Sequence, residues 1–514
     1  MFSTIKQDLP ASIVVFFVAV PLCLGIALAS GAPLFSGLIA GIIGGIIVGA
    51  LSNSALGVSG PAAGLAVIVL TSIQSLGAFD VFLVAVVLAG IFQVVLGLLK
   101  GGVIGYYFPS SVIKGMLTGI GIIIFLKQIP HALGYDADYE GDLAFVQADG
   151  QNTFTELVNM LDYISPGAVI VSILSLTILL VWDISLSHKH KLFKLVQGPL
   201  VAVAAGIGYQ MAATAFFPAF AIQSQHLVSV PVAESFSGFL GQFTLPDFSQ
   251  ILNADVWVIG ITIAVVASLE TLLSVEATDK LDPQKRLTAT NRELLAQGGG
   301  NIISGLIGGL PITQVIVRSS ANIQSGGTSK MAAILHGFFL LFCVAFIPFV
   351  LNMIPLAVLA CILFVVGYKL AKPSLFKQMY KLGWSQFAPF LVTILGIVFT
   401  DLLKGISLGV VVALIILLRN SFKNSHFMVQ EGGKDGDNKV IMTLAEEVTF
   451  INKSVILKAL DELEPGTDLT IDMSRSKDID YDVLEIIDNY QETAKEKGIK
   501  VKLINRGNLQ TADY

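Results

Sequence analysis

The sequence predicts an α-helical membrane protein with many spans, followed by a small soluble α/β domain. Three observations support this prediction. Hydrophobic residues make up 54% of the 514 residues and charged residues only 13%, with a mean hydropathy of +0.78, and this composition excludes a water-soluble globule for most of the chain. Two proline-led stretches recur half a chain apart, and the sequence becomes polar after Leu418.

Apolar segments of roughly 20 residues are long enough to cross a bilayer. We read the first as a retained span, because no basic n-region and cleavage site mark it as a signal peptide. The strong candidates are Ser12–Ala29, Ala78–Leu99, Ala168–Trp182, Val256–Val275, Met331–Leu351 and Ile406–Leu418. Weaker segments, several of them rich in glycine, lie at Leu34–Leu51, Ala62–Leu76, Leu294–Leu306 and Ile312–Asn322.

Loop charges predict the orientation. Three connections are basic, at residues 187–194, 279–292 and 369–381, and the positive-inside rule places them in the cytoplasm. The connections at 134–162 and 218–255 contain no Lys or Arg and are expected outside. Fourteen spans put every loop on its proper side, so we expect both termini to be cytoplasmic in a multi-pass protein of the inner (cytoplasmic) membrane.

The two proline-led stretches indicate an internal repeat. They run from Gly57 to Gly64 and from Gly308 to Gln314, and their prolines are 311 − 61 = 250 positions apart. Proline suits the first turn of a helix, and glycine permits close approach of a backbone or a ligand. We therefore expect each proline to open a half-helix, the second being Pro311–Val317. Their free N–H groups and positive dipole ends would face a shared point inside the membrane, which favours an anion.

The polar C-terminal region predicts a separate domain. We assign residues 1–419 to a transmembrane transport domain, 420–436 to a linker and 437–514 to a soluble domain of β-α-β-α-β order. The expected helices are Lys453–Leu463 and Tyr481–Glu496. No catalytic constellation or phosphate loop is evident, so we expect a regulatory or dimer-forming module instead of an enzyme.

Motifs in the membrane region resemble the sulfate permease (SulP) family of anion transporters. They are Asp8–Ser12, Gly308–Pro311, Arg318-Ser319 and Asn322–Thr328, and the tail resembles the STAS domain of those proteins. The resemblance implies fourteen spans in a seven-plus-seven inverted repeat, divided into a core domain and a gate domain. It also implies a homodimer and elevator-like alternating access.

Glu270 is a carboxylate in the middle of an apolar span, where an unpaired charge costs about 3 kcal/mol or more. We favour a coupling function over a protonated residue that caps a neighbouring broken helix. In the family, an acidic residue at this point is associated with sodium or proton coupling. Ser274 lies on the same helix face and offers a hydroxyl to the same cation. The choice between a proton and a sodium ion stays open, and no other cofactor or metal is expected.

Arg318 is the second charge that needs an explanation, because it follows the predicted half-helix. By the resemblance it lies close to the anion, while a salt bridge with Glu270 or a contact with backbone carbonyls is the alternative. The substrate residues that we predict are Leu22, Cys23, Ala62, Ala63, Gly64, Thr313, Gln314, Val315, Ile316 and Arg318. Thr313 and Gln314 are the polar side chains expected to reach the ligand, and for Leu22 and Cys23 helix packing is the stronger alternative.

Three functional hypotheses follow. The first is a secondary transporter of a small inorganic anion, bicarbonate or sulfate, coupled to sodium or protons. The second is a nucleobase permease on the same fold, although such a site would need a pair of acidic residues and only Glu270 is well placed. The third is a non-transporting membrane sensor that signals through its tail. None of the three has nucleic acid as a partner.

Overall fold

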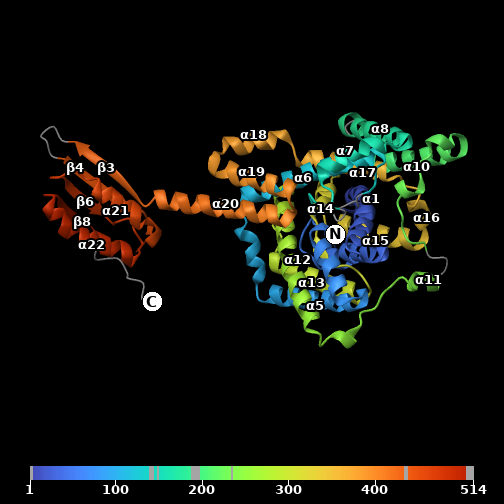
Figure 1. Cartoon of the computed structure of the whole chain (residues 1–514), viewed down its shortest axis with the longest axis horizontal. Helices are drawn as coiled ribbons and strands as arrows, with labels where there is room; N and C mark the ends of the chain where they lie inside the picture. The colour runs from blue at the N-terminus through green and yellow to red at the C-terminus, as the bar shows by residue number, and fades with distance from the viewer. Residues whose placement is uncertain are drawn as a thin grey trace. The chain divides into compact units, whose positions relative to one another are not determined.

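The computed structural model describes residues 4–137, 144–146, 150–186, 197–232, 236–432 and 438–504. The chain forms two compact units, residues 1–410 and residues 411–514 (Figure 1), which we describe one after the other. The basic loop predicted at residues 187–194 lies outside the described residues.

The first unit is helical. In the first half of the chain the helices are α1 (Ile5–Ala29), α2 (Leu34–Ile43), α3 (Gly49–Leu51), α4 (Ala66–Leu76), α5 (Phe79–Leu98), α6 (Ser110–Leu133), α7 (Thr153–Asn159), α8 (Pro166–Val181), α10 (Gly198–Phe216) and α11 (Phe236–Leu240). In the second half they are α12 (Ala254–Leu281), α13 (Thr290–Leu306), α14 (Ile316–Gln324), α15 (Met331–Phe346), α16 (Pro348–Leu351), α17 (Leu356–Leu370), α18 (Pro373–Lys381), α19 (Trp384–Phe399) and α20 (Leu402–Lys423).

Among the described residues, nine helical segments are long and apolar enough to cross a bilayer, and three shorter apolar helices accompany them. The strong candidate spans all fall on helices, which confirms a multi-pass membrane protein. The predicted span Met331–Leu351 is broken at Ile347 into α15 and α16. The number fourteen stays a prediction.

Local signals fix several helix ends. Gly134 ends α6 in the left-handed conformation, with a φ of 84°, which glycine adopts at little cost. Pro166 opens α8, where its missing N–H leaves no hydrogen bond unmade.

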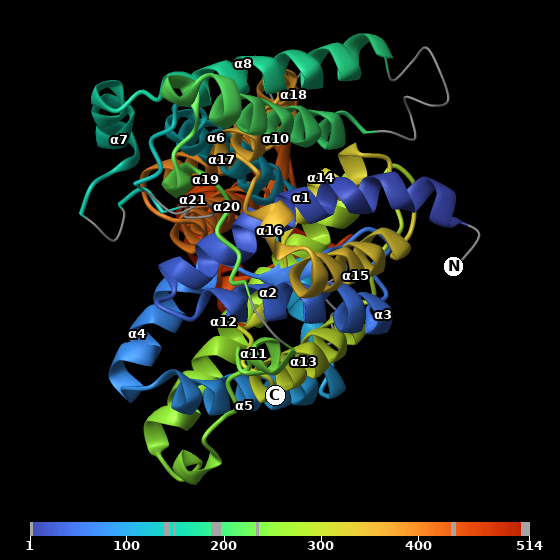
Figure 2. The ribbon, with the colours of Figure 1, turned by 90° about the vertical axis from the view of Figure 1, so that its right-hand side faces the viewer.

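The helices pack in two bundles, and each bundle draws on both halves of the chain. In the first bundle, α12 and α13 pack on α5, and α15 packs on α1 beside α2 and α14. In the second bundle, α17 and α19 pack on α6, and α10 packs on α8. Figure 2 shows the second bundle at the top and the first bundle below it. Both bundles therefore contain helices from both halves of the chain, as the predicted inverted repeat implies.

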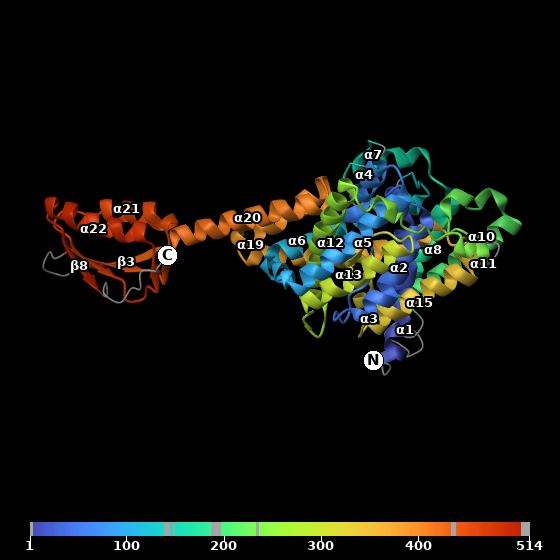
Figure 3. The same cartoon turned by 90° about the horizontal axis from the view of Figure 1, so that it is seen from below.

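The second unit contains a four-stranded sheet covered by two helices. Its strands, in spatial order, are β3 (His426–Gly432), β4 (Asn438–Leu444), β6 (Asp468–Asp472) and β8 (Lys500–Ile504). β3 is antiparallel to β4, and the other neighbours are parallel. Helices α21 (Lys453–Asp461) and α22 (Tyr481–Glu496) lie on one face of the sheet (Figure 3), over a core that includes Met442, Ile471 and Ile487.

The β-α-β-α-β order predicted for the tail is confirmed by β4, α21, β6, α22 and β8. β3 differs from the prediction, because it lies in residues assigned to the linker. The reason is that the strand pairs along seven residues with β4, and Met428 packs against the apolar core. Residues 433–437 of the predicted linker lie outside the described part of the chain.

The two loops predicted to face outside meet at Asp136. Its two carboxylate oxygens lie 2.5 Å from Nδ1 of His131, near the end of α6, and 2.5 Å from Nδ1 of His226 in the second loop. The Asp136 side chain is only 7% exposed. Burial raises the pKa of Asp136, but the hydrogen bonds from both histidines outweigh burial and hold the pKa below its usual value of 3.8.

We expect this bridge between the two loops to stabilise the folded protein at neutral pH. Because the pKa of the folded state is lowered, the stabilisation is fully present above pH ~4 and is lost as the pH falls through the lowered pKa. Asp136→Asn should lower the free energy of unfolding by about 1–3 kcal/mol at pH 6, since it weakens hydrogen bonds to a charged group. Thermal unfolding in detergent from pH 3 to pH 7 checks this, and a difference between the two proteins that persists undiminished at the acid end would contradict it.

Candidate functional site

Two short strands cross inside the first bundle. β1 (Ser59–Pro61) and β2 (Ile312–Gln314) pair antiparallel, with Ser59 opposite Gln314 and Pro61 opposite Ile312. The predicted half-helix Pro311–Val317 is therefore wrong in its bounds: the prolines belong to or border the strands, and the helices begin after them. α14 begins at Ile316, and on the other side a turn of 3-10 helix (η3, Ala63–Leu65) leads into α4.

Both helices still begin beside the strand crossing, as the repeat predicts. The N-cap residues of η3, α4 and α14 make no side-chain capping bond, and in η3 the Gly64 N–H donates to the Glu270 carboxyl group from α12. Uncapped N–H groups and the positive end of the helix dipole make such ends good anion sites.

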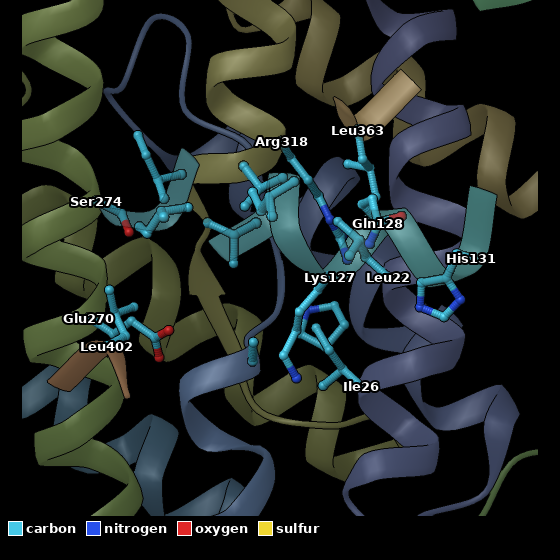
Figure 4. Close-up of a pocket in the computed structure, with 17 residues that line it drawn as sticks. Leu22, Ile26, Lys127, Gln128, His131, Glu270, Ser274, Arg318, Leu363 and Leu402 are labelled. Carbon is cyan, nitrogen blue, oxygen red and sulfur yellow. The ribbon is translucent and has the colours of Figure 1, made fainter. Parts of the chain in front are cut away.

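A cavity lies between the crossing and the second bundle (Figure 4). The volume within it that the centre of a water-sized sphere can occupy is about 60 Å³. This is several times the volume that one ordered water requires by the same measure. From the first bundle its wall comprises Leu22, Ile26, Pro61, Ala63, Glu270, Ser274, Val315, Ile316, Val317 and Arg318. From α6, α17 and α20 it comprises Ile120, Ile124, Lys127, Gln128, His131, Leu363 and Leu402.

Arg318 belongs to the first turn of α14 and is only 1% exposed. Its Nη2 donates to the Cys23 sulfur at 3.3 Å, and its Nε and Nη1 have no hydrogen-bond partner among the described residues. The guanidinium lies directly on Gly60, where an added Cβ would come within 2.1 Å of Nη1, so any larger residue there would displace the guanidinium. The predicted alternative, a salt bridge with Glu270, is not formed within the part of the chain that the structure describes.

Glu270 lies on α12 and is 6% exposed. Its carboxyl group rests on Gly64, where an added Cβ would lie 2.9 Å from Oε1, and its Oε2 has no partner among the residues described. Ser274, one turn further along α12, also lines the cavity. Glu270 and Ser274 thus present oxygen atoms to the cavity from one side of it (Figure 4).

The sequence analysis missed three polar residues of α6 on the cavity wall. Lys127, Gln128 and His131 are all buried, and Figure 4 shows them on the side opposite Glu270 and Ser274. Their signal was available in the sequence, because a lysine, an amide and an imidazole at i, i+1 and i+4 are costly in an otherwise apolar span.

The structure brings seven of the predicted residues to the cavity wall: Leu22, Ala63, Glu270, Ser274, Val315, Ile316 and Arg318. It does not bring Cys23, Ala62, Gly64, Thr313 or Gln314 to that wall. Cys23 accepts from Arg318, and Gly64 lies behind the wall against Glu270. The Gln314 side-chain amide donates to the Thr278 hydroxyl of α12 at 3.1 Å, and the Gln314 backbone N–H donates to the Thr271 hydroxyl at 3.3 Å.

The charges of this site suit an anion. Two cationic side chains, Lys127 and Arg318, line the cavity together with one carboxyl group, and the first turn of α14 adds its dipole. The described residues contain no group of three His, Cys, Asp or Glu side chains arranged to hold a metal ion. Glu270 and Ser274 offer the oxygen ligands that a hard cation prefers.

The chain matches the model of the sulfate permease family over residues 5–418. It is 29% identical over 428 residues to the putative sulfate transporter YvdB of Bacillus subtilis, with 83% of this chain and 76% of that protein covered. It is 26% identical over 454 residues to the bicarbonate transporter BicA of Picosynechococcus sp., with coverage of 87% and 76%.

Solved structures share the fold. The murine anion transporter Slc26a9 superposes with a TM-score of 0.65 at 16% identity, covering 97% of this chain and 85% of that chain. The transmembrane domain of a cyanobacterium bicarbonate transporter BicA superposes with a TM-score of 0.55 at 24% identity, covering 79% of this chain and 98% of that one.

Enlarging Ala63 tests whether this cavity binds the ligand. Ala63→Phe should fill much of the space and weaken anion binding at least tenfold, at a packing cost of about 1–3 kcal/mol that the unit can survive. Isothermal titration with sulfate and bicarbonate measures the affinity. Val67→Phe, on the exposed side of α4, is the control. Unchanged affinity in a folded Ala63→Phe protein would place the site elsewhere.

Proposed function

The chain belongs to the sulfate permease family, and from this we propose that it is a secondary transporter of a small inorganic anion. It is a multi-pass membrane protein of a transporter family and not an enzyme. The observation that supports the proposal most directly is a buried arginine, without a carboxylate partner in the described residues, beside a small cavity at the start of α14. A charge held this way in a membrane is costly unless a ligand compensates it.

Bicarbonate and sulfate are the substrates that we favour. Relatives named as sulfate and bicarbonate transporters match most of the chain. The cavity is small, and its two cations and helix N-terminus match a compact oxyanion. A nucleobase site would need a pair of acidic side chains, and Glu270 is the single acidic residue on the described cavity wall. A sensor would have no need of two helix starts that face one cavity.

The anion is taken up together with a sodium ion or a proton bound at Glu270. Support comes from the position of Glu270, which lines the same cavity as Arg318 but bonds to none of the described cations. A cation at Glu270 would offset the anion's charge, so the loaded site crosses the membrane at lower electrostatic cost.

Transport proceeds by movement of the first bundle against the second. The cavity wall is shared between them, because Ala63, Glu270 and Arg318 belong to the first bundle and Lys127 and Leu363 to the second. A displacement of one bundle along the other therefore opens the cavity to one side, as elevator-like alternating access requires.

Both termini lie in the cytoplasm in this proposal. Asp8 near the chain start accepts from the Thr328 amide at 2.7 Å, and Arg286 of the basic 279–292 connection donates to the Thr328 carbonyl at 2.8 Å. These basic and N-terminal segments thus gather at one end. The loops joined at Asp136 are the acidic ones expected outside.

A flux screen in liposomes tests the proposal. The protein is reconstituted, and uptake of bicarbonate, sulfate, chloride and fumarate is measured with and without a sodium gradient and with and without a pH gradient. We expect saturable uptake of one small oxyanion that one of the two gradients drives. Uptake of none of them, by protein that is folded and inserted, would contradict the proposal.

Glu270→Gln should abolish gradient-driven uptake, because the amide keeps the size of the side chain but cannot ionise. Initial rates in proteoliposomes measure the loss. The companion variant is Ser274→Ala, which removes the neighbouring hydroxyl. It should weaken the sodium dependence of uptake only if sodium is the coupling ion. Wild-type uptake by Glu270→Gln would exclude this residue as the coupling site.

The tail should be dispensable for binding, since all residues of the cavity wall precede Val410. Because β3 pairs with β4, a cut at residue 437 would leave β3 without its partner, and a cut after Asn424 is cleaner. The chain shortened to residues 1–424 should bind anion with unchanged affinity, while its transport rate or its dimerisation falls. Equilibrium binding and initial-rate flux separate the two effects, and loss of affinity in folded protein would assign the tail a part in the site.

A further inference from the structure

The two crossing strands are too short to hold their own position. β1 and β2 pair over only three residues each, and an isolated two-stranded pair is marginally stable at best. The Val315 amide donates to the Val58 carbonyl opposite it at 2.9 Å, and bonded pairs alternate along an antiparallel ladder, so Pro61 and Ile312 form a non-hydrogen-bonded pair. The N–H and C=O of Ile312 therefore point away from β1 and need partners elsewhere. Another element must therefore hold β2 at its place in the membrane.

That element is α13, through four buried polar side chains on one face. Glu293, Gln297, Asn301 and Ser304 are spaced by four, four and three residues, and all four are fully buried. We call them the polar stripe.

Asn301 of the polar stripe hydrogen-bonds to the backbone of β2 from the side away from β1. Its Oδ1 accepts from the Ile312 amide at 2.5 Å, and its Nδ2 donates to the Ile312 carbonyl at 3.0 Å. The side-chain amide thus takes the place of a third strand at Ile312 and satisfies both backbone groups of a residue that makes no ladder bond to β1.

The neighbours of Asn301 fix the remaining segments. Gln297 donates to the Ser59 hydroxyl of β1 at 2.7 Å, and Ser304 donates to the Leu310 carbonyl at 2.8 Å. On α5, Gln93 accepts from Asn301 at 2.6 Å and is itself fully buried. Both crossing strands are therefore attached to one helix that does not line the cavity.

We propose that Asn301, with Gln297 and Ser304, positions the anion site by setting where β1 and β2 cross. Ile312 is four residues before Ile316 and six before Arg318, so a shift of β2 displaces the first turn of α14 and the guanidinium together. Asn301 is a positioning residue, since it acts through β2 and does not touch the cavity. The inference rests on the proposed function for its ligand, an oxyanion.

The chain contains a matched control. Asn352 grips Val230 with the same two bonds, accepting from the Val230 amide at 2.6 Å and donating to its carbonyl at 2.9 Å. Neither Asn352 nor Val230 lines the cavity. Replacing Asn352 therefore removes the same two kinds of hydrogen bond at a place that does not position α14.

The experiment compares Asn301→Leu with Asn352→Leu in the full-length protein. Sulfate and bicarbonate affinities are measured by isothermal titration, stability by thermal unfolding, and backbone hydrogen exchange of residues 310–318 by mass spectrometry. We expect Asn301→Leu to weaken anion binding at least about tenfold and to speed exchange in 310–318. Asn352→Leu should lower stability but leave both quantities at wild-type values. Gln93→Leu, which keeps the grip on Ile312, should fall between the two and serves if Asn301→Leu does not fold.

Wild-type affinity in folded Asn301→Leu would overturn the inference, and so would an equal loss of affinity in Asn352→Leu. If the wild-type protein binds neither anion, the proposed function fails. Hydrogen exchange in residues 310–318 then still tests whether Asn301 holds β2 in place. Faster exchange than in Asn352→Leu then supports the positioning role, and equal exchange refutes it.

Discussion

The antiparallel contact between β1 and β2 is the constraint on which the site depends. It joins two segments that are half a chain apart, and it fixes the starts of α4 and α14 relative to each other. Two glycines of the first segment then decide where charge can sit. Gly60 accommodates the Arg318 guanidinium on one side and Gly64 accommodates the Glu270 carboxyl group on the other. Without this crossing, neither charge would have a defined position in the membrane.

Keeping these two charges apart is what makes the site useful for transport. A direct Arg318–Glu270 pair would neutralise itself and leave nothing for a ligand. In the structure, the segment from Gly60 in β1 to Gly64 in η3 separates them, and each keeps unsatisfied hydrogen-bonding capacity within the described residues. The two side chains suit ligands of opposite charge, because an anion can bind to the arginine and a cation to the glutamate. In the transport cycle that we propose, binding of one ion favours binding of the other.

Much of the fold could be predicted from the sequence, because hydropathy and helix period are local properties. The range Tyr481–Glu496 is both the predicted and the observed helix α22. The role of Pro61 could not be predicted, since a φ near −65° fits both a first helical turn and a strand, and the deciding partner, Ile312, is 251 positions away. Lys127 could have been predicted as a site residue, because a lysine in an apolar span is costly, but α6 carries no proline-led repeat that would connect it with the anion site. Thr313 and Gln314 lie off the cavity wall because they belong to β2, where Thr313 pairs with Gly60 and Gln314 bonds to Thr278 of α12. These partners are distant in sequence, so a local helical interpretation could not reveal them.

The three-residue register of the crossing also limits how the sequence can change in evolution. In a strand, adding or deleting one residue exchanges the two faces. A single-residue insertion between Ser59 and Gly64 would remove Gly60 from beneath Arg318 or Gly64 from beneath Glu270, and a side chain would take the vacated place. Alignments of related sequences should therefore contain no gaps in these few positions, while gaps accumulate freely in the loop after α10. The number of residues between Ser59 and Gly64 therefore constrains the anion site as strongly as the identity of any side chain that binds the ligand.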